Sequence, residues 1–511
     1  MIVTVPALGG GLNSDEAPHE LRDGEWSRGN NVRFDAGYVG KIKGHADAPI
    51  TAPAGAVYHV APYQTPGKRF WIHSGLASTY ADDGSTQTDI SGTALTGDAD
   101  DRFTSCTIGG IYVQNNQKDT PRYWDGNTAN NLAALTDWDS TWRCKSMRSF
   151  RNYLIALNVT KNTTAYPHMV KWSDAAVPGA IPSEWVPAVD NDANERDLAE
   201  TEDQIVDGLA MGDVFVVYKE RSMFGLQFIG GNTIFRSFRM PGNYGALAVN
   251  CVVQTPMGHV VLTPGPDLVL HQGGEPQSIL TGRMRRWLRS TLDARKADRA
   301  FVASNPAYNE VWACLPTGAS GNATKALIWN YKDNTFTTRD LPSATCAATG
   351  QITVAASADQ WNSAVGNWDA DADWWNNSEL SQADRRLLMG TATGRVYVMD
   401  DTETFGGELV AAYVERTGMA FGDAATTKTL RTIYPRIDGD DGGQILIQVG
   451  AAMDPEGAYT WSPAVTYTIG ESYRADAFAT GRFLALRLRS TTANKWRLKS
   501  CDFELVKRGS Y

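Results

Sequence analysis

Residues 31–44 read Asn-Val-Arg-Phe-Asp-Ala-Gly-Tyr-Val-Gly-Lys-Ile-Lys-Gly, and the interpretation of the whole chain starts from this stretch. Val32 and Phe34 alternate with polar residues before the Asp-Ala-Gly segment, and Tyr38 and Ile42 do so after it. Each arm can therefore bury one face, as a β-strand does. A short loop that ends in glycine between two such arms is typical of a β-hairpin. Because a lone hairpin is barely stable in water, we expect it to join a sheet made by later residues.

The composition favours an all-β protein. The chain has 511 residues, 42% of them hydrophobic, with 48 Gly, 22 Pro and 16 Trp. Long apolar helical periodicities are almost absent, so many short strands joined by turns are expected. The cysteines are scattered without the spacing of a metal site, and we expect reduced thiols rather than disulfides in a core of this size. They are Cys106, Cys144, Cys251, Cys314, Cys346 and Cys501.

The charge and the apolar stretches limit the cellular setting. The first residues lack a basic segment and a long apolar run, so we expect no secretory signal and synthesis in a cytosol. No apolar stretch approaches the roughly 18 residues that a membrane span needs. The net charge of −10 argues against gripping nucleic acid over a large surface, because such binding requires the phosphates to be neutralised. A passage through which DNA slides remains compatible with this charge.

Units of roughly 35 to 50 residues recur after the hairpin, which is the spacing of propeller blades. Each contains alternating apolar strands broken by Gly, Asn or Asp, and residues 205–219 show the pattern most clearly. We expect about six blades, with seven as the alternative if the region near 360–378 contributes. The last strands, near 386–399, are too few for a blade, and we expect the hairpin at 31–44 to complete them. Such closure removes exposed strand edges.

The predicted domains are an N-terminal arm (1–30), a β-propeller (31–401) and a C-terminal β-sandwich (402–511). The sandwich is predicted from longer strands after residue 401. Within the propeller, residues 281–298 carry Met284 and Leu288 at helical spacing and predict one amphipathic helix. Residues near 360–378 form a polar insertion with a tryptophan every seven residues.

The order of these features resembles the tail nozzle proteins of short-tailed bacteriophages, also called packaged-DNA stabilisation proteins. The resemblance covers nearly the whole chain. The segments that carry it are the arm Gly10-Gly11-Leu12-Asn13, the stretch 31–44, Lys171-Trp172-Ser173-Asp174, the Trp-Asp insertion at 361–375, residues 481–489 (Gly-Arg-Phe-Leu-Ala-Leu-Arg-Leu-Arg) and Trp496-Arg497-Leu498.

This resemblance implies a structural virion protein in the phage tail, assembled in the host cytoplasm. It implies a hexameric ring below the portal and the head-to-tail adaptor, with tail fibre or tail needle proteins as further partners. The ring would retain the packaged genome and conduct duplex DNA during ejection, without sequence-specific binding. The same reading implies no enzyme activity, no catalytic residues, no cofactor and no bound metal.

The arginines of the predicted helix are the candidate contact residues. Guanidinium groups suit both phosphate and carboxylate, so they could face DNA or the acidic surface of a neighbouring subunit. Of these two we favour a protein neighbour, and ordinary solvation of a helix is the simpler alternative. The candidates are Arg283, Arg285, Arg286 and Arg289.

The alternative function is a glycan-binding or glycan-cleaving propeller of the phage tail. A hydrolase would need two or three carboxylates converging on a central cavity, and the candidates end strands in different units: Asp82, Asp125, Asp174 and Asp400. Exposed tryptophans would stack on sugars, although aromatic residues also join blades: Trp124, Trp138, Trp142 and Trp185. Asp369, Asp371 and Asp373 resemble the start of a calcium loop, but Trp374 occupies the position where that loop needs glycine. A solvated loop is therefore the preferred reading.

Overall fold

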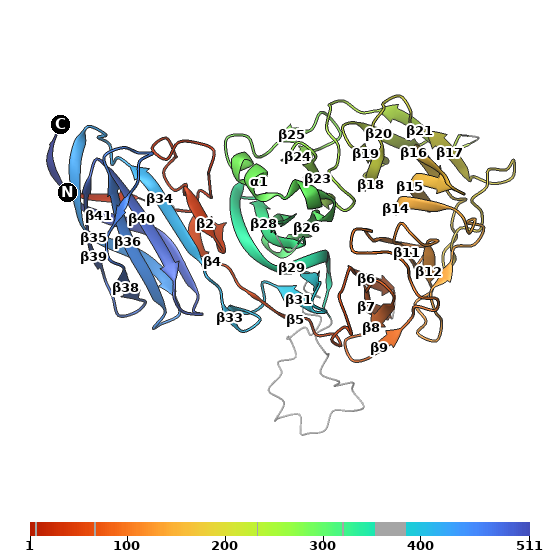
Figure 1. Cartoon of the computed structure of the whole chain (residues 1–511), viewed down its shortest axis with the longest axis horizontal. Helices are drawn as coiled ribbons and strands as arrows, with labels where there is room; N and C mark the ends of the chain where they lie inside the picture. The colour runs from red at the N-terminus through yellow and green to blue at the C-terminus, as the bar shows by residue number, and fades with distance from the viewer. Residues whose placement is uncertain (6–7, 66–67, 232, 319–320, 353–384, 511) are drawn as a thin grey trace, which may run out of the picture.

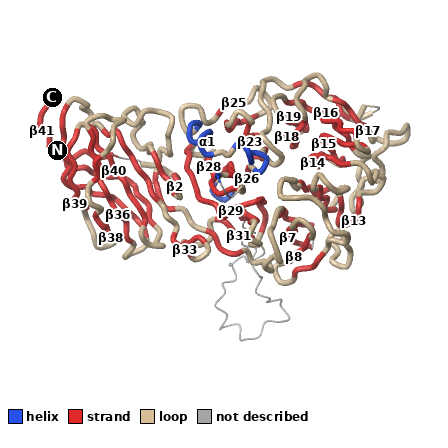
Figure 2. Tube along the Cα trace, in the orientation of Figure 1, coloured by secondary structure: helices blue, strands red, loops and turns tan. Residues whose placement is uncertain are grey.

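The computed structural model describes residues 1–511 except 6–7, 66–67, 232, 319–320, 353–384 and 511. A β-propeller and a β-sandwich lie side by side, and both chain termini lie at the far end of the sandwich (Figure 1). Figure 2 shows helical segments, in blue, near the boundary between the two bodies. The tryptophan-rich insertion and its candidate calcium carboxylates fall outside the described residues.

Five blades are separate sheets of four antiparallel strands. The first two comprise β6 (His59–Thr65), β7 (Lys68–Ser74), β8 (Thr79–Asp82) and β9 (Gln87–Asp89), then β10 (Thr104–Ile108), β11 (Ile111–Asn115), β12 (Arg122–Trp124) and β13 (Ala133–Ala134). The third and fourth comprise β14 (Arg143–Phe150), β15 (Tyr153–Lys161), β16 (Thr164–Trp172) and β17 (Asn194–Asp197), then β18 (Ile205–Met211), β19 (Val214–Lys219), β20 (Met223–Phe228) and β21 (Phe235–Arg239). The fifth comprises β22 (Val252–Thr255), β23 (Gly258–Thr263), β24 (Asp267–His271) and β25 (Gln277–Ser278).

Two further blades share one nine-stranded sheet. Its strands are β26 (Phe301–Asn305), β27 (Glu310–Pro316), β28 (Ala323–Asn330), β29 (Thr335–Gln351), β30 (Arg385–Thr391), β31 (Val396–Met399), β5 (His45–Asp47), β32 (Thr404–Phe405) and β33 (Glu408–Leu409). The first half of β29 pairs with β28 and the second half with β30. Between the halves Ser343 has a φ of +52°, a bend that carries the strand from one blade into the next.

The described residues therefore form a ring of seven blades rather than the expected six, and the region near 360–378, on which the seven-blade alternative depended, lies outside them. The innermost strands contact one another in the cyclic order β6, β10, β14, β18, β22, β26, β29, and β29 returns to β6. The extra blade is hidden in the sequence because one continuous strand serves two blades.

The ring is closed by the N-terminal part of the chain, but not by the expected strands. β5 pairs with β31 and completes the last blade. The hairpin forms as predicted from β3 (Val32–Asp35) and β4 (Tyr38–Lys41), yet β4 pairs with β41 (Trp496–Ser510) of the sandwich. The prediction that the hairpin itself pairs with strands near 386–399 is therefore wrong. The apolar face of the hairpin packs into the larger core of the sandwich. The residues that follow it form β5, which pairs with the last blade.

The sandwich consists of two sheets that contain the N-terminal residues. One holds β3, β4, β41, β35 (Thr426–Gly439) and β39 (Ala475–Gly481), with β1 (Ile2–Val5) on β41. The other holds β2 (Arg28–Asn30), β34 (Tyr413–Met419), β40 (Phe483–Ser490), β36 (Gln444–Ala452) and β37 (Thr460–Trp461), with β38 (Val465–Thr468) on β36. The expected boundary between residues 30 and 31 thus needs correction, because strands β1 to β4 all belong to the sandwich sheets.

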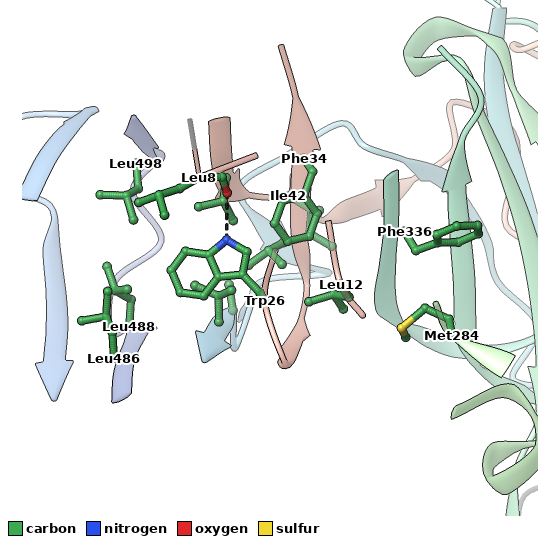
Figure 3. Packing of buried hydrophobic residues seen from close by; sticks show 14 of the residues in the cluster. Leu8, Leu12, Trp26, Phe34, Ile42, Met284, Phe336, Leu486, Leu488 and Leu498 are labelled. Atoms are coloured by element: carbon green, nitrogen blue, oxygen red, sulfur yellow. Dashed lines mark hydrogen bonds between the residues drawn. The ribbon is translucent and has the colours of Figure 1, made fainter. Parts of the chain in front are cut away.

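A single apolar core runs from the sandwich into the propeller (Figure 3). Trp26 lies at its centre with no exposed surface, and its indole Nε1 donates to the Leu8 carbonyl at 2.8 Å. Leu12 and Phe336 continue the core toward the blades. Because burial of apolar surface in one continuous cluster stabilises both bodies together, we expect them to behave as one rigid unit.

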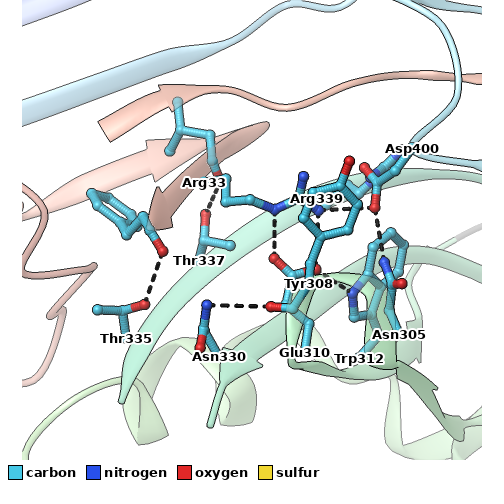
Figure 4. A network of polar contacts seen from close by, with 12 residues as sticks. Arg33, Asn305, Tyr308, Glu310, Trp312, Asn330, Thr335, Thr337, Arg339 and Asp400 are labelled. Carbon is cyan, nitrogen blue, oxygen red and sulfur yellow. Dashed lines mark hydrogen bonds and ion pairs between the residues drawn. The ribbon is translucent and has the colours of Figure 1, made fainter. Parts of the chain in front are cut away.

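Four charged residues, which we call the junction cluster, fasten the hairpin to the propeller (Figure 4): Arg33, Glu310, Arg339 and Asp400. Arg33 donates to Glu310 at 2.6 Å and to Asp400 at 2.8 Å, and Arg339 donates to Asp400 at 2.6 Å. Burial opposes ionisation of Asp400, but the two guanidinium groups outweigh it and lower its pKa. Each charge therefore has an opposite partner.

The predicted helix at 281–298 is two short segments. α1 (Arg285–Thr291) ends at Leu292, and a 3-10 helix follows over Ala294–Arg299. Between them Asp293 is extended, donates its N–H to the Pro316 carbonyl at 3.0 Å, and accepts a bond from the Arg295 N–H. The helix breaks because the hydrogen bond to β27 replaces the next intrahelical one. A second 3-10 segment, Pro306–Tyr308, precedes β27.

The six cysteines are free thiols, as expected, and five of them are buried. Among the described residues, no helix combines the length and the apolar character that crossing a membrane requires.

Candidate interaction surface

The N-terminal arm holds α1 in place. The Asp15 carboxylate accepts hydrogen bonds from the backbone N–H groups of Arg285 at 2.9 Å and Arg286 at 2.8 Å. These are N–H groups that the first turn of a helix leaves without partners. On the inner side of α1, Met284 and Leu288 are buried in the core. The outer side is thereby fixed toward solvent.

The four candidate arginines separate into two kinds. Arg283 lies 3.8 Å from Glu25, and Arg285 lies 3.2 Å from Asp267, so both are tied to neighbouring segments. Arg286 and Arg289 are exposed, and within the described residues neither forms an ion pair. The structure therefore leaves Arg286 and Arg289 available for an external partner.

α1 forms one wall of a cleft of about 840 Å³ between the propeller and the sandwich. We call it the junction cleft. The arm residues Asp15 and Glu16 also line it, together with residues of the sandwich. Aromatic residues from both bodies line it: Trp287, Tyr413, Tyr459 and Trp461.

The charges of the junction cleft are mixed. Its lining includes three arginines (Arg28, Arg286, Arg487) and four carboxylates (Asp15, Glu16, Glu415, Glu456). Arg487 donates to Glu415 at 2.7 Å and stacks 3.8 Å above the Trp461 ring. A surface that neutralises phosphates needs an excess of cations, which this cleft lacks. The balance favours a protein surface with charges of both signs.

A second cavity, of about 190 Å³, lies on the propeller axis. We call it the axial cavity. Residues from the innermost strand of every blade, or from directly beside that strand, line it. Its charged lining residues are Arg102, Arg148 and Asp207. Arg148 donates to Asp207 at 2.6 Å, and Asn250 accepts from Arg148 at 2.9 Å while donating to the Phe103 carbonyl at 2.9 Å. These bonds cross-link the blades around the axis.

His59 also lines the axial cavity. Its ring Nε2 lies 3.0 Å from the Tyr112 hydroxyl. Burial, together with the positive charges of Arg148 and Arg102, lowers the pKa of His59 to about 3. The imidazole is therefore neutral at physiological pH.

The carboxylates of the glycan-cleaving alternative do not converge. Asp82 is the buried last residue of β8 and accepts from the Thr51 N–H, and Asp125 accepts from the Asn127 N–H of its own turn. Asp174 accepts from the Asp192 N–H, and Asp400 belongs to the junction cluster. None of the four lines the axial cavity.

The candidate sugar-stacking tryptophans are mostly buried. Trp124 and Trp138 are 1% and 5% exposed, and Trp185 has no exposed surface. Trp138 and Trp185 meet edge to face with ring centroids 4.7 Å apart. The half-buried Trp142 lies under the ammonium groups of Lys161 and Lys171. These rings join elements of the fold, which was the simpler of the two readings.

Sequence reasoning missed the axial residues Arg102, Arg148 and Asp207. The available signal was a charged residue in or directly before a strand that is otherwise apolar, because such a strand lies inside the fold and its charge needs a partner. Their meeting at one place depends on the order of the blades around the ring, which the sequence pattern does not reveal.

No family model and no curated protein matches the chain. The chain is similar to the WD40 β-propeller domain of Doa1, at 10% identity and a TM-score of 0.37 over 70% of this chain and 96% of that one. It is also similar to the β-propeller domain of Myceliophteria thermophila Cps50 (Swd1), at 10% identity and a TM-score of 0.39 over 70% and 100%. A third, YCF48 bound to D1 peptide, has 11% identity and a TM-score of 0.36 over 70% and 97%. The class of protein is an all-β propeller joined to a β-sandwich.

Proposed function

We propose that this chain is a structural subunit of a viral tail, a tail nozzle protein of a short-tailed bacteriophage. Copies form a hexameric ring below the portal and adaptor, retain the packaged genome and conduct DNA during ejection. The sequence resemblance across nearly the whole chain is the source of this proposal. The chain acts without catalysis, cofactor or metal.

The observation that carries the proposal is the junction between the two bodies. The N-terminal chain first completes both sandwich sheets and then, through β5, closes the propeller. The shared core and the junction cluster lie between these two points. A ring that surrounds a pressurised genome needs stiff subunits, and one continuous core supplies stiffness.

DNA passes through the hole of the ring in this proposal, not through the propeller. The axial cavity is far smaller than a duplex, and side chains from several blades cross it. The net charge of −10 suits a wall that does not hold phosphates by many ion pairs.

Arg286 and Arg289 are the proposed contacts to the neighbouring subunit. They project from a helix that Asp15 and the core hold firmly, beside a cleft of mixed charge. An acidic chain offers an adjacent copy many carboxylates as partners. The proposed location in the virion tail and the partners at the head and tail sides follow from the resemblance.

The alternative, a glycan-binding or glycan-cleaving propeller, has less support. A cleaving site needs at least two carboxylates, and the axial cavity is lined by one, Asp207, which is ion-paired to Arg148.

A nuclease-protection assay tests the proposed function. Genome-filled heads assembled without this chain are expected to release DNA to added nuclease, and purified full-length chain is expected to restore protection. Heads that keep their DNA protected without the chain would overturn the proposal. Heads with the chain depleted and then restored provide the matched control.

A further inference from the structure

The axial cavity holds an excess of positive charge. Arg102 and Arg148 contribute two cations, and Asp207 is the one carboxylate of its lining. His59 is neutral, as shown above. The thiols of Cys346 and Cys251 near Arg102 are neutral too, because burial raises their pKa to about 11 and about 12. One buried positive charge therefore has no counter-charge in the lining.

Arg102 is the arginine without a counter-charge. Arg102 is 6% exposed, and within the part of the chain that the structure describes its guanidinium donates one hydrogen bond, from Nη2 to the Thr345 carbonyl at 2.9 Å. Its Nε is buried and has no partner among the described residues. The nearby carboxylate of Asp100 is paired with Arg299 at 2.5 Å and Lys296 at 3.4 Å instead.

The energetic cost of an unpaired buried cation indicates that the cavity lacks an anion. A buried ion without a partner costs several kcal/mol, and arginine does not escape the cost by losing its proton. Of the bonds formed within the described residues, none uses Nη1 of Arg102 or of Arg148. Two guanidinium groups with unused donors line one cavity, and such groups match the oxygens of a planar or tetrahedral anion.

We propose that the axial cavity binds a small inorganic oxyanion of the phosphate or sulfate class, held by Arg102 with Arg148. The cavity of about 190 Å³ has room for such an ion with a few waters. Because residues of all seven blades line the cavity, the anion links the blades at the axis and stabilises the closed ring of strands. This site is independent of the proposed tail function.

Thermal unfolding of the full chain in inorganic phosphate tests the proposal. The titration is made at millimolar phosphate and constant ionic strength, with chloride as the replaced ion. The wild-type Tm is expected to rise saturably, by about 3 °C at a hundredfold excess over the dissociation constant. The variant Arg102→Gln is expected to lose this rise.

Two further variants keep the test decisive. Arg295→Gln removes an exposed arginine of the 3-10 helix after α1 and is expected to keep the full phosphate response. Arg102→Lys retains the cation and is expected to keep part of the response, so it replaces Arg102→Gln if that variant does not fold. A wild-type Tm without a saturable rise, or a rise that is equal in the wild type and in the folded Arg102 variants, would overturn the proposal.

Discussion

The junction cluster and the axial cavity both combine arginines with carboxylates, but in different numbers. In the junction cluster Arg33 and Arg339 meet Glu310 and Asp400, so two cations face two anions. In the axial cavity Arg102 and Arg148 face Asp207 alone. Buried arginine thus fastens two parts of the chain where its charge is matched, and creates a binding site where it is not.

The pKa values of the two arginines Arg33 and Arg102 reflect the same difference. Burial opposes the charge of Arg33, but Asp400 and Glu310 outweigh it and raise its pKa. For Arg102 burial prevails, and its pKa is lowered. The first arginine is stabilised by its surroundings, whereas the second is stabilised only when an anion arrives.

Removing one charge of the junction cluster has the largest expected effect on stability. Asp400→Asn leaves the buried Arg339 without its carboxylate partner and Arg33 with Glu310 alone, and we expect a loss of about 3–5 kcal/mol in the free energy of unfolding. Denaturant unfolding measures it. The matched control, Asp401→Asn, changes an exposed neighbour and is expected to stay within about 0.5 kcal/mol of the wild type. Equal stability of the two variants would contradict the role of the cluster.

The axial cavity is expected to give the chain a pH-dependent stability. His59 has a pKa of about 3 in the folded chain, against about 6.5 when unfolded. Between these values only the unfolded state binds the proton, so the stabilisation is complete above pH 6.5 and is lost as the pH falls toward 3. Its contribution to the slope is about 1.4 kcal/mol per pH unit.

Unfolding of His59→Gln at several pH values between 6 and 4 checks this contribution. The free energy of unfolding of the variant should fall less steeply with acidification than that of the wild type. His19→Gln, which removes an exposed histidine of the N-terminal arm, is the control and should follow the wild-type slope. Parallel curves for the wild type and His59→Gln would show that His59 is not buried and neutral as described.

The sequence predicts local elements of this fold better than their partners. The hairpin at 31–44 was predictable, because alternation and turn residues are local properties. In the structure Ala36 and Gly37 form its turn, with positive φ values of 48° and 82°. Its pairing with β41 was not, since two open sheet edges compete for the same N-terminal chain. Gly44 lies where the chain passes from the hairpin to β5. An added Cβ at this position would lie 1.8 Å from the Thr404 carbonyl oxygen, so only glycine fits.

For the candidate sites too, local features were predictable from the sequence and their distant partners were not. The helical spacing of Met284 and Leu288 predicted which side of α1 is buried. Arg283 and Arg285 form ion pairs, whereas Arg286 and Arg289 form none with the described residues. This difference depends on Glu25 and Asp267, which lie elsewhere in the chain. The axial cavity could not be predicted from the sequence, because its lining depends on the order of all seven blades around the ring.

Electron microscopy of the purified full chain tests the central claim, that rigid copies of this chain surround a path for DNA. We predict closed rings with a central opening wide enough for a duplex. The double variant Arg286→Glu, Arg289→Glu should keep the wild-type Tm within a few degrees but form fewer rings, while Arg295→Glu, an exposed arginine of the following 3-10 helix, should assemble as the wild type does. A chain that remains a discrete monomer at every concentration, even with the portal and adaptor present, would contradict the account.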